Sequence, residues 1–313
     1  MQSPGLEFQI IQQFFAGHAR YDASVSCGIG DDAAVIVPTL GMSQVISVDT
    51  SIAGRHFPED ADAFDVACRA LNVSLSDLAA MGAKARWFTL AISLPQVDKS
   101  WLDRFTQGLF FAASRADVQL IGGDTTKGPL VITIQVQGEI PAGKALLRSG
   151  AKSGDYIYVS GYLGDAGAGL AVYRGNLPHN EVLLQAYLHP EPELSLGLQL
   201  REKANSCIDV SDGLLADLAH ILRASNVGAE VDLDRVPLSS ALLDTVEHMQ
   251  ALKLALTAGD DYKLCFTSAL SPQDLDIKSM HCIGRITENP ELVLLNKPEG
   301  LEIMQSGFDH FYE

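Results

Sequence analysis

Apolar residues recur at helical spacing in residues 64–82, FDVACRALNVSLSDLAAMG, and share one face: Val66, Ala70 and Val73. Four positions further along this stripe the residue is Asp77. An unbroken helix would therefore point a carboxylate toward the packed interior, where a lone charge needs a cation or a metal. Alternatively, Ser76 or Asp77 caps a new helix that begins at Leu78. The segment alone leaves both interpretations open.

Other segments alternate between strand and helix patterns. The patterns predict helices at 1–17 (with Phe8, Ile11 and Phe15 on one face), 99–116, 164–173 and 214–223. They predict strands at 33–37, 44–49, 87–94, 118–121, 130–137, 155–160, 205–210, 229–233, 262–267 and 281–286. Glycine and small polar residues predict turns or loops at 28–32 and 122–126.

Small and helix-breaking residues dominate residues 141–154, PAGKALLRSGAKSG, and we expect a domain boundary there. The two domains would be 1–142 and 143–313. Both halves mix strands with helices, and no internal repeat is visible. The expected fold class is α+β, with two mixed α/β-sandwich-like domains.

Composition narrows the class of protein. The 39 acidic and 22 basic residues give a net charge of −17, so nucleic acid and anionic membranes are poor partners. No apolar run approaches the ~18 residues of a membrane span, and the N-terminus lacks a basic signal-peptide region. The five cysteines form no CxxC pair, which favours reduced thiols and a cytoplasmic location.

Several carboxylates share one setting, at the end of a predicted strand beside glycine or a small hydroxyl residue. They are Asp31, Asp32, Asp49, Asp124, Asp209, Asp212, Asp260 and Asp261. Each one alone is ordinary turn chemistry. Together with Asp77 they suit Mg²⁺, which prefers a few carboxylates plus substrate phosphates.

The motifs of other site types are missing. No zinc-spaced His/Cys cluster, EF-hand, GxSxG elbow, Walker A or kinase glycine loop occurs. An acidic site is suited to phosphoryl transfer, in which metals neutralise charge and the protein positions the phosphates. Arg148 and Lys152 are the basic residues best placed to reach a phosphate, unless they are simply solvated charges on the linker.

Seven motifs occur in a specific order: GIGDDAA, VDTSIAGRHF, NVSLSDLAAMGA, LIGGDTT, LLRSGAKSGD, IDVSDGL and AGDDYKL. From about Gly28 to the C-terminus, the chain resembles the bacterial thiamine-monophosphate kinases. This family lies within the aminoimidazole ribonucleotide synthetase-like enzymes. The resemblance implies ATP-dependent phosphorylation of thiamine monophosphate to thiamine diphosphate by direct in-line transfer. It also implies a homodimer in which the N-terminal domains pair into a barrel, with the nucleotide near that interface.

The resemblance also implies a role for individual positions. Mg²⁺ ligands, some through water or the main chain, would be Asp32, Ser47, Val48, Asp49, Asp77, Asp124, Asp209 and Asp212. Nucleotide contacts would be Gly123, Asp124, Arg148 and Ser211. Substrate contacts would be His56, Asp260 and Phe308, and the carboxylates most directly involved in transfer would be Asp77, Asp124 and Asp212. No covalent phospho-enzyme is implied.

The chain departs from the family pattern near its C-terminal end. The family usually has GGEDYEL where this chain has AGDDYKL, so Asp260 is one methylene shorter than the usual Glu, and Lys263 reverses a common acid. Phe308 occupies an aromatic position that often carries a polar group. Thiamine recognition is therefore where differences from the family are expected.

Two other functions fit parts of the pattern. A synthetase of the same group could use another acceptor, although the selenophosphate-forming members usually carry a reactive Cys or selenocysteine in a glycine-rich N-terminal segment, which residues 1–21 lack. A non-catalytic acidic protein that binds divalent ions would explain the charge. It would not explain acids beside glycine at strand ends.

Overall fold

The computed structural model describes residues 5–303 and residue 307. Its contacts divide the chain into two compact units. The first unit extends to Leu78 and includes Ala83–Lys144, and the second contains Ala79–Gly82 and the chain from Ala145 onward. Both units mix helices and strands, which confirms the expected α+β class.

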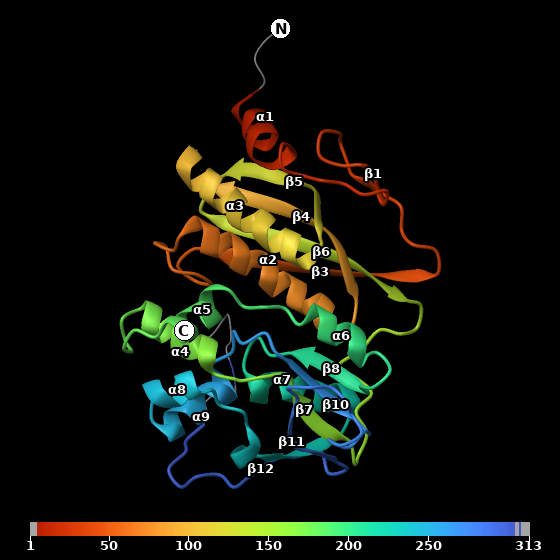
Figure 1. Cartoon of the computed structure of the whole chain (residues 1–313), viewed down its shortest axis with the longest axis vertical. Coiled ribbons are helices and arrows are strands. Elements are labelled where there is room, and N and C mark those ends of the chain that lie inside the picture. The colour runs from red at the N-terminus through yellow and green to blue at the C-terminus, as the bar shows by residue number, and fades with distance from the viewer. Residues whose placement is uncertain (1–4, 304–306, 308–313) are drawn as a thin grey trace. The chain divides into compact units, whose positions relative to one another are not determined.

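The first unit contains a four-stranded sheet with the order β3-β6-β4-β5, in which only β4 and β5 are parallel. The strands are β3 (Met42–Ile52), β4 (Lys84–Leu94), β5 (Gln119–Lys127) and β6 (Val131–Pro141). Helices α2 (Ala63–Ala80) and α3 (Lys99–Ala116) lie together on one face of this sheet (Figure 1). Ile132, Ile134 and Val136 of β6 are buried at alternate positions, as a half-covered sheet requires.

A short hairpin, β1 (Val25–Cys27) and β2 (Val35–Ile36), also belongs to the first unit. Val25 packs with Trp87 and Ile121, and Ala34 and Ile36 lie against this cluster. The N-terminal helix α1 (Leu6–Ile10) continues as a π-helix, Ile11–Ala16. Its buried side chains are Ile10, Phe14 and Phe15, whereas Phe8 is exposed, so the predicted face of this helix was partly wrong.

The second unit contains a six-stranded sheet with the order β12-β9-β11-β7-β10-β8. Its strands are β7 (Tyr156–Val159), β8 (Ser206–Asp209), β9 (Gly228–Asp232), β10 (Leu264–Ser268), β11 (His281–Thr287) and β12 (Leu292–Leu295). Its helices are α4 (Asp165–Tyr173), α5 (Glu181–Leu188), α6 (Leu194–Leu200), α7 (Leu214–Ser225), α8 (Ser240–Thr245) and α9 (His248–Thr257), with a 3₁₀-helix at Leu233–Arg235.

Helix α7 anchors the second unit's core. Its predicted apolar side is buried: Leu214, Leu218, Ile221 and Leu222. These side chains belong to one cluster with Val231 of β9 and Ile283 of β11. None of the helices in the described part of the chain is long and apolar enough to cross a membrane.

Candidate functional site

Strand β3 and helix α2 bring three of the predicted metal ligands together in the first unit. Ser47 and Asp49 occupy alternate positions of β3, so their side chains share one face of the strand. Helix α2 runs without a break through Asp77, which excludes the alternative that a new helix is capped at Ser76 or Asp77. The Ser47 hydroxyl donates a hydrogen bond to Asp77 Oδ2. Asp77 is therefore fixed against β3.

Asp49 is the electrostatically unusual member of this group. Burial, and then the nearby Asp77 carboxylate, raise its pKa to about 6, while a hydrogen bond from Ser74 opposes the shift. Its Oδ2 atom is buried and has no hydrogen-bond partner among the described residues. Two neighbouring carboxylates, one with an unsatisfied buried oxygen, form a site that a hard divalent cation would complete. The residues present therefore fit Mg²⁺.

This group is only part of the expected ligand set. Among residues 5–303 and 307, no three or more His, Cys, Asp or Glu side chains are arranged to hold a metal ion. The first unit supplies two carboxylates and a hydroxyl at this point. Val48 lies between Ser47 and Asp49 with its side chain exposed on the opposite face, so only its main chain could join them.

The segment 122–126 was predicted as a loop, and that prediction was wrong because it continues strand β5 beside β4. Glycine at position 123 allows β5 to pair this closely with β4. A Cβ on Gly123 would lie 1.8 Å from the Leu90 carbonyl oxygen, so no other residue fits without separating the strands. Asp124 is exposed, and Thr125, which follows it, is buried.

Asp124 and Asp49 lie at opposite edges of the sheet. In the strand register, Asp124 pairs with Ala91, Ala91 with Thr133, and Thr133 with Thr50. Three strand spacings of ~4.8 Å separate β5 from β3, or roughly 14 Å. Asp124 also belongs to the same face as Thr50, whereas Asp49 faces the other way. Within one chain, the two carboxylates cannot ligate the same ion directly.

Asp32 lies in the exposed loop of the β1–β2 hairpin. Its N–H donates to the Asp31 carboxylate at 2.9 Å, which orders the turn locally. His56 follows β3, and its Nδ1 accepts the Ile52 N–H at 3.0 Å. Because Nδ1 acts as an acceptor, the neutral ring carries its proton on Nε2. The neutral His56 ring therefore has one N–H donor, on Nε2.

In the second unit, β8 and the loop before α7 carry Asp209, Ser211 and Asp212. Asp209 is buried at the end of β8. The loop is fixed by a residue that the sequence reasoning missed, Asp217. Its Oδ2 accepts the N–H groups of Ser211, Asp212 and Gly213 at 3.0, 3.0 and 3.1 Å. An acid in the first turn of a helix that follows a glycine was the available signal.

Burial raises the pKa of Asp217 to about 7, and the nearby Asp212 and Asp209 carboxylates add to the shift. The same loop lies near basic groups. Burial, Arg148 and Arg223 lower the pKa of His220, whereas Asp212 acts in the opposite direction. Arg148 and Asp212 therefore both act on the His220 ring, and Arg148 is exposed. Lys152 is exposed too, and its N–H donates to Asp155.

The AGDDY segment has an unusual backbone. Gly259, Asp260 and Tyr262 all have left-handed φ angles, of 72°, 63° and 49°, and Asp260 N–H donates to the Ser211 carbonyl at 2.8 Å. Non-glycine residues in this region store strain that surrounding contacts must offset. The segment thus holds Asp260 beside the Ser211 loop.

Asp261 is a structural residue rather than a second ligand. It is buried and accepts the N–H groups of Gly164 at 2.8 Å and Ala166 at 3.4 Å, at the start of α4. Burial raises its pKa to about 8. Lys263, the departure from the family pattern, forms an ion pair with Glu193 at 3.2 Å, so its reversed charge is matched locally.

Phe308 lies outside the described residues. The nearest described neighbour in sequence, Gly307, lies against the loop before α7. A Cβ there would be 2.4 Å from Ala216 Cβ and 2.7 Å from the Asp212 carbonyl oxygen.

Family models match both parts of the chain. The model described as AIR synthase related protein, N-terminal domain, matches residues 30–140, and the C-terminal domain model matches residues 152–300. The thiamine-monophosphate kinase of Escherichia coli (strain K12) is 45% identical over 318 residues, covering 97% of this chain and 98% of that protein.

Solved structures agree with these matches. The thiamine-monophosphate kinase from Stenotrophomonas maltophilia K279a has a TM-score of 0.85 and 41% identity, covering 92% of this chain and 96% of that one. A structure of AaThiL complexed with AMPPCP and TMP has a TM-score of 0.78 and 29% identity, covering 91% and 93%. The chain belongs to the AIR synthase related protein family and, within it, to the branch of the thiamine-monophosphate kinases.

Proposed function

We propose that this protein transfers the γ-phosphoryl group of ATP to thiamine monophosphate, giving ADP and thiamine diphosphate. The observation that carries the proposal is 45% identity to a thiamine-monophosphate kinase along 97% of the chain. A structural relative binds both AMPPCP, an ATP analogue, and TMP. This whole-chain similarity disfavours a synthetase with another acceptor and a non-catalytic ion-binding protein.

We infer that Mg²⁺ is the metal. The unsatisfied buried oxygen of Asp49, the adjacent Asp77 and the Ser47 hydroxyl support a site for a hard cation. The resemblance adds Asp32, Asp124, Asp209, Asp212 and the Val48 main chain to the ligands. Mg²⁺ held there would neutralise charge on the transferring phosphoryl oxygens.

The protein's own groups bind and orient the two phosphate substrates. A phosphate oxygen of thiamine monophosphate forms a bond to the γ-phosphorus, while the bond from that phosphorus to ADP breaks, so no side chain has to act as a nucleophile. Gly123 and Ser211 contact the nucleotide, and Arg148 supplies a cation for it. His56 Nε2–H can donate to the substrate, and we propose that Asp260 and Phe308 contact it as well.

We propose that residues 1–142 supply dimerisation and most of the metal ligands, and that residues 143–313 complete the nucleotide and substrate contacts. Free thiols at all five cysteines support a reducing compartment, the cytoplasm.

A homodimer is supported by the uncovered face of the first unit's sheet. Met42, Ile46, Val48 and Ile52 on the edge strand β3 are 39–59% exposed, and such a patch on an edge strand is typical of an interface. A second copy that paired its β5 edge with this β3 edge would place its Asp124 near Asp49. That arrangement would remove the separation by three strands. Because the two side chains face opposite sides of the sheet, one of them would act through water.

A coupled assay of ADP release with ATP, thiamine monophosphate and Mg²⁺ tests the activity. We expect turnover in the wild type, none with excess EDTA, and a loss of at least about 100-fold in Asp77→Asn. Asp103→Asn, a matched change at an exposed position of α3, should keep its activity. Near-normal turnover of folded Asp77→Asn would refute the role of Asp77. A lack of ADP formation by the wild type would refute the kinase.

A further inference from the structure

We propose that Arg86 is a positioning residue that fixes the β1–β2 hairpin, and with it Asp32, by linking both ends of the hairpin to the sheet. This inference rests on the proposed function, in which Asp32 is an Mg²⁺ ligand. The hairpin pairs β1 with β2, and the Val37 N–H donates to the Ser24 carbonyl at 2.7 Å. Its loop, residues 28–34, carries Asp31 and Asp32, and the Ile29 N–H in this loop donates to the Tyr21 hydroxyl at 2.9 Å.

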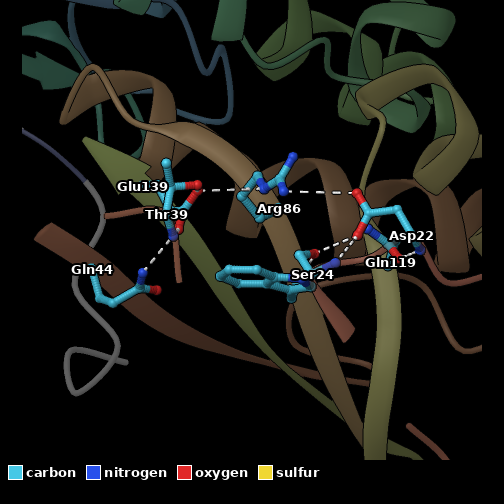
Figure 2. Close-up of polar contacts among 8 residues, drawn as sticks. Asp22, Ser24, Thr39, Gln44, Arg86, Gln119 and Glu139 are labelled. Carbon is cyan, nitrogen blue, oxygen red and sulfur yellow. Dashed lines mark hydrogen bonds and ion pairs between the residues drawn. The ribbon is translucent and has the colours of Figure 1, made fainter. Parts of the chain in front are cut away.

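The first end of the hairpin is attached through Asp22 and Ser24. The Asp22 carboxylate accepts the Ser24 N–H and hydroxyl and lies 3.7 Å from Arg86 Nη2 (Figure 2). The Asp22 N–H donates to the Gln119 side chain of β5 at 2.8 Å, and Trp87 Nε1 donates to Ser24 Oγ at 3.0 Å. The start of the hairpin is thus held by β4 and β5.

The second end is attached through Thr39 and Glu139. Glu139 Oε1 accepts the Thr39 N–H at 2.6 Å, and Oε2 accepts the Thr39 hydroxyl at 2.8 Å. Gln44 Nε2 donates to Glu139 Oε1 at 3.3 Å. Glu139 is only 4% exposed, so its negative charge needs a nearby cation.

Arg86 supplies that cation and joins the two ends. Its Nε lies 3.5 Å from Glu139 Oε2 and makes no hydrogen bond among the described residues, while Nη2 faces Asp22, so the guanidinium is linked to both carboxylates by charge (Figure 2). The Arg86 side chain is 18% exposed, and its guanidinium lies 5.5 Å from the centroid of the Trp87 ring. A planar guanidinium can reach two carboxylates at once, which the single ammonium of lysine does less well.

The consequence for the site is preorganisation. Asp31 and Asp32 are exposed, and the Tyr21 hydroxyl that binds Ile29 of the loop belongs to the residue before Asp22, so the position of the loop depends on the hairpin base. If the base is released, metal binding must also order the loop, and the apparent affinity for Mg²⁺ falls. The maximal rate at saturating Mg²⁺ should change much less, because Arg86 is not among the residues proposed to contact the phosphates or the metal.

The test is Arg86→Gln, with the Mg²⁺ dependence of ADP formation as the readout. We expect the half-activating Mg²⁺ concentration to rise about tenfold or more, with kcat at saturating Mg²⁺ within about threefold of the wild type. Arg86→Lys should restore part of the shift. Arg104→Gln breaks an exposed ion pair with Asp62 in the same unit and should leave the Mg²⁺ dependence unchanged.

Hydrogen–deuterium exchange gives a readout that does not require kinase activity. Amides of residues 28–39 should exchange faster in Arg86→Gln than in the wild type, while amides of β6 keep their rates. Should Arg86→Gln fail to fold, Thr39→Val removes one hydrogen bond to Glu139 and should cause a smaller shift in the same direction.

The inference would be overturned if folded Arg86→Gln kept the Mg²⁺ dependence and the exchange rates of the wild type. A lower thermal stability with no change in these two measurements would overturn it as well. Faster exchange in 28–39, with a wild type that releases no ADP, would keep the link between Arg86 and the hairpin and refute the kinase.

Discussion

At the scale of single residues, buried carboxylates divide into two kinds. Asp217 and Asp261 accept backbone N–H groups and hold loops in place, whereas Asp49 has a buried oxygen with no hydrogen-bond partner among the described residues. Local sequence does not separate these kinds, because Asp49 lies beside Thr50 and Ser51, and Asp217 and Asp261 each follow a nearby glycine. Their partners separate them. A carboxylate that accepts hydrogen bonds from its own chain stabilises the fold, whereas one with a buried oxygen that accepts no hydrogen bond can bind a cation.

Asp261 makes stability depend on pH. Its pKa is about 8 in the folded chain against an ordinary value of 3.8, because burial disfavours its charge. Its contribution is fully present below about pH 4 and is lost as pH rises toward 8, by up to about 1.4 kcal/mol per pH unit. Asp261→Asn keeps an acceptor oxygen and removes this titration. The free energy of unfolding of Asp261→Asn in urea, relative to that of the wild type, should therefore increase between pH 5 and pH 8.

The wild type, unfolded in the same buffers, is the reference at each pH. A difference between Asp261→Asn and the wild type that stayed constant from pH 5 to pH 8 would mean that Asp261 is ionised in the folded protein.

At the scale of elements, the contact between β4 and β5 depends on one glycine. Gly123→Ala would place a methyl group against the Leu90 carbonyl, and we expect a loss of about 1–3 kcal/mol or more in the free energy of unfolding. Gly122→Ala is the matched control, because its Cβ would meet only the Thr89 methyl at 4.0 Å. Equal unfolding midpoints for the two variants would show that the strands can separate at no cost.

The sequence predicted most helices and strands whose apolar residues recur at regular spacing. It did not predict features that depend on residues far away in the chain. The helical span of α2 and the apolar side of α7 follow from apolar spacing. Helix α7 buries one stripe, whereas α2 is buried at consecutive positions such as Val66, Ala67 and Cys68, and Val73 of the predicted stripe is only half-buried. The strand at 122–126 was missed because two glycines and an aspartate are typical of a loop, and only the neighbouring β4 backbone explains why glycine is required. The role of Asp217 was missed for the same reason, since its three donors are defined by the folded loop.

The candidate site was predictable in its residue types and only partly in its geometry. The helical spacing of apolar residues predicted that Asp77 points toward the interior, and in the structure Asp77 lies against Ser47, beside Asp49. No local pattern could show that Asp49 and Asp124 lie on opposite edges and faces of one sheet, because strand order is a property of the whole domain.

At the scale of the whole molecule, we expect two chains to share their active sites. Asp49→Asn and Asp124→Asn should each be inactive alone. In a twofold dimer that joins Asp49 of one chain to Asp124 of the other, a mixed dimer contains one intact pair and one doubly altered pair. Co-expression with two affinity tags should therefore yield mixed dimers with about half of the wild-type activity. Inactive mixed dimers, or a monomeric wild type in sedimentation, would contradict the shared site.

The three amides that converge on Asp217 restrict how a nucleotide can be held. Loops before helices often bind anions with their free peptide N–H groups, but those of Ser211, Asp212 and Gly213 are already occupied by an internal acid. An arriving phosphate would have to displace that acid or rely on side chains. We therefore expect the Ser211 hydroxyl and the Asp212 carboxylate, rather than these amides, to meet a nucleotide. ATP would be recognised there as its metal complex.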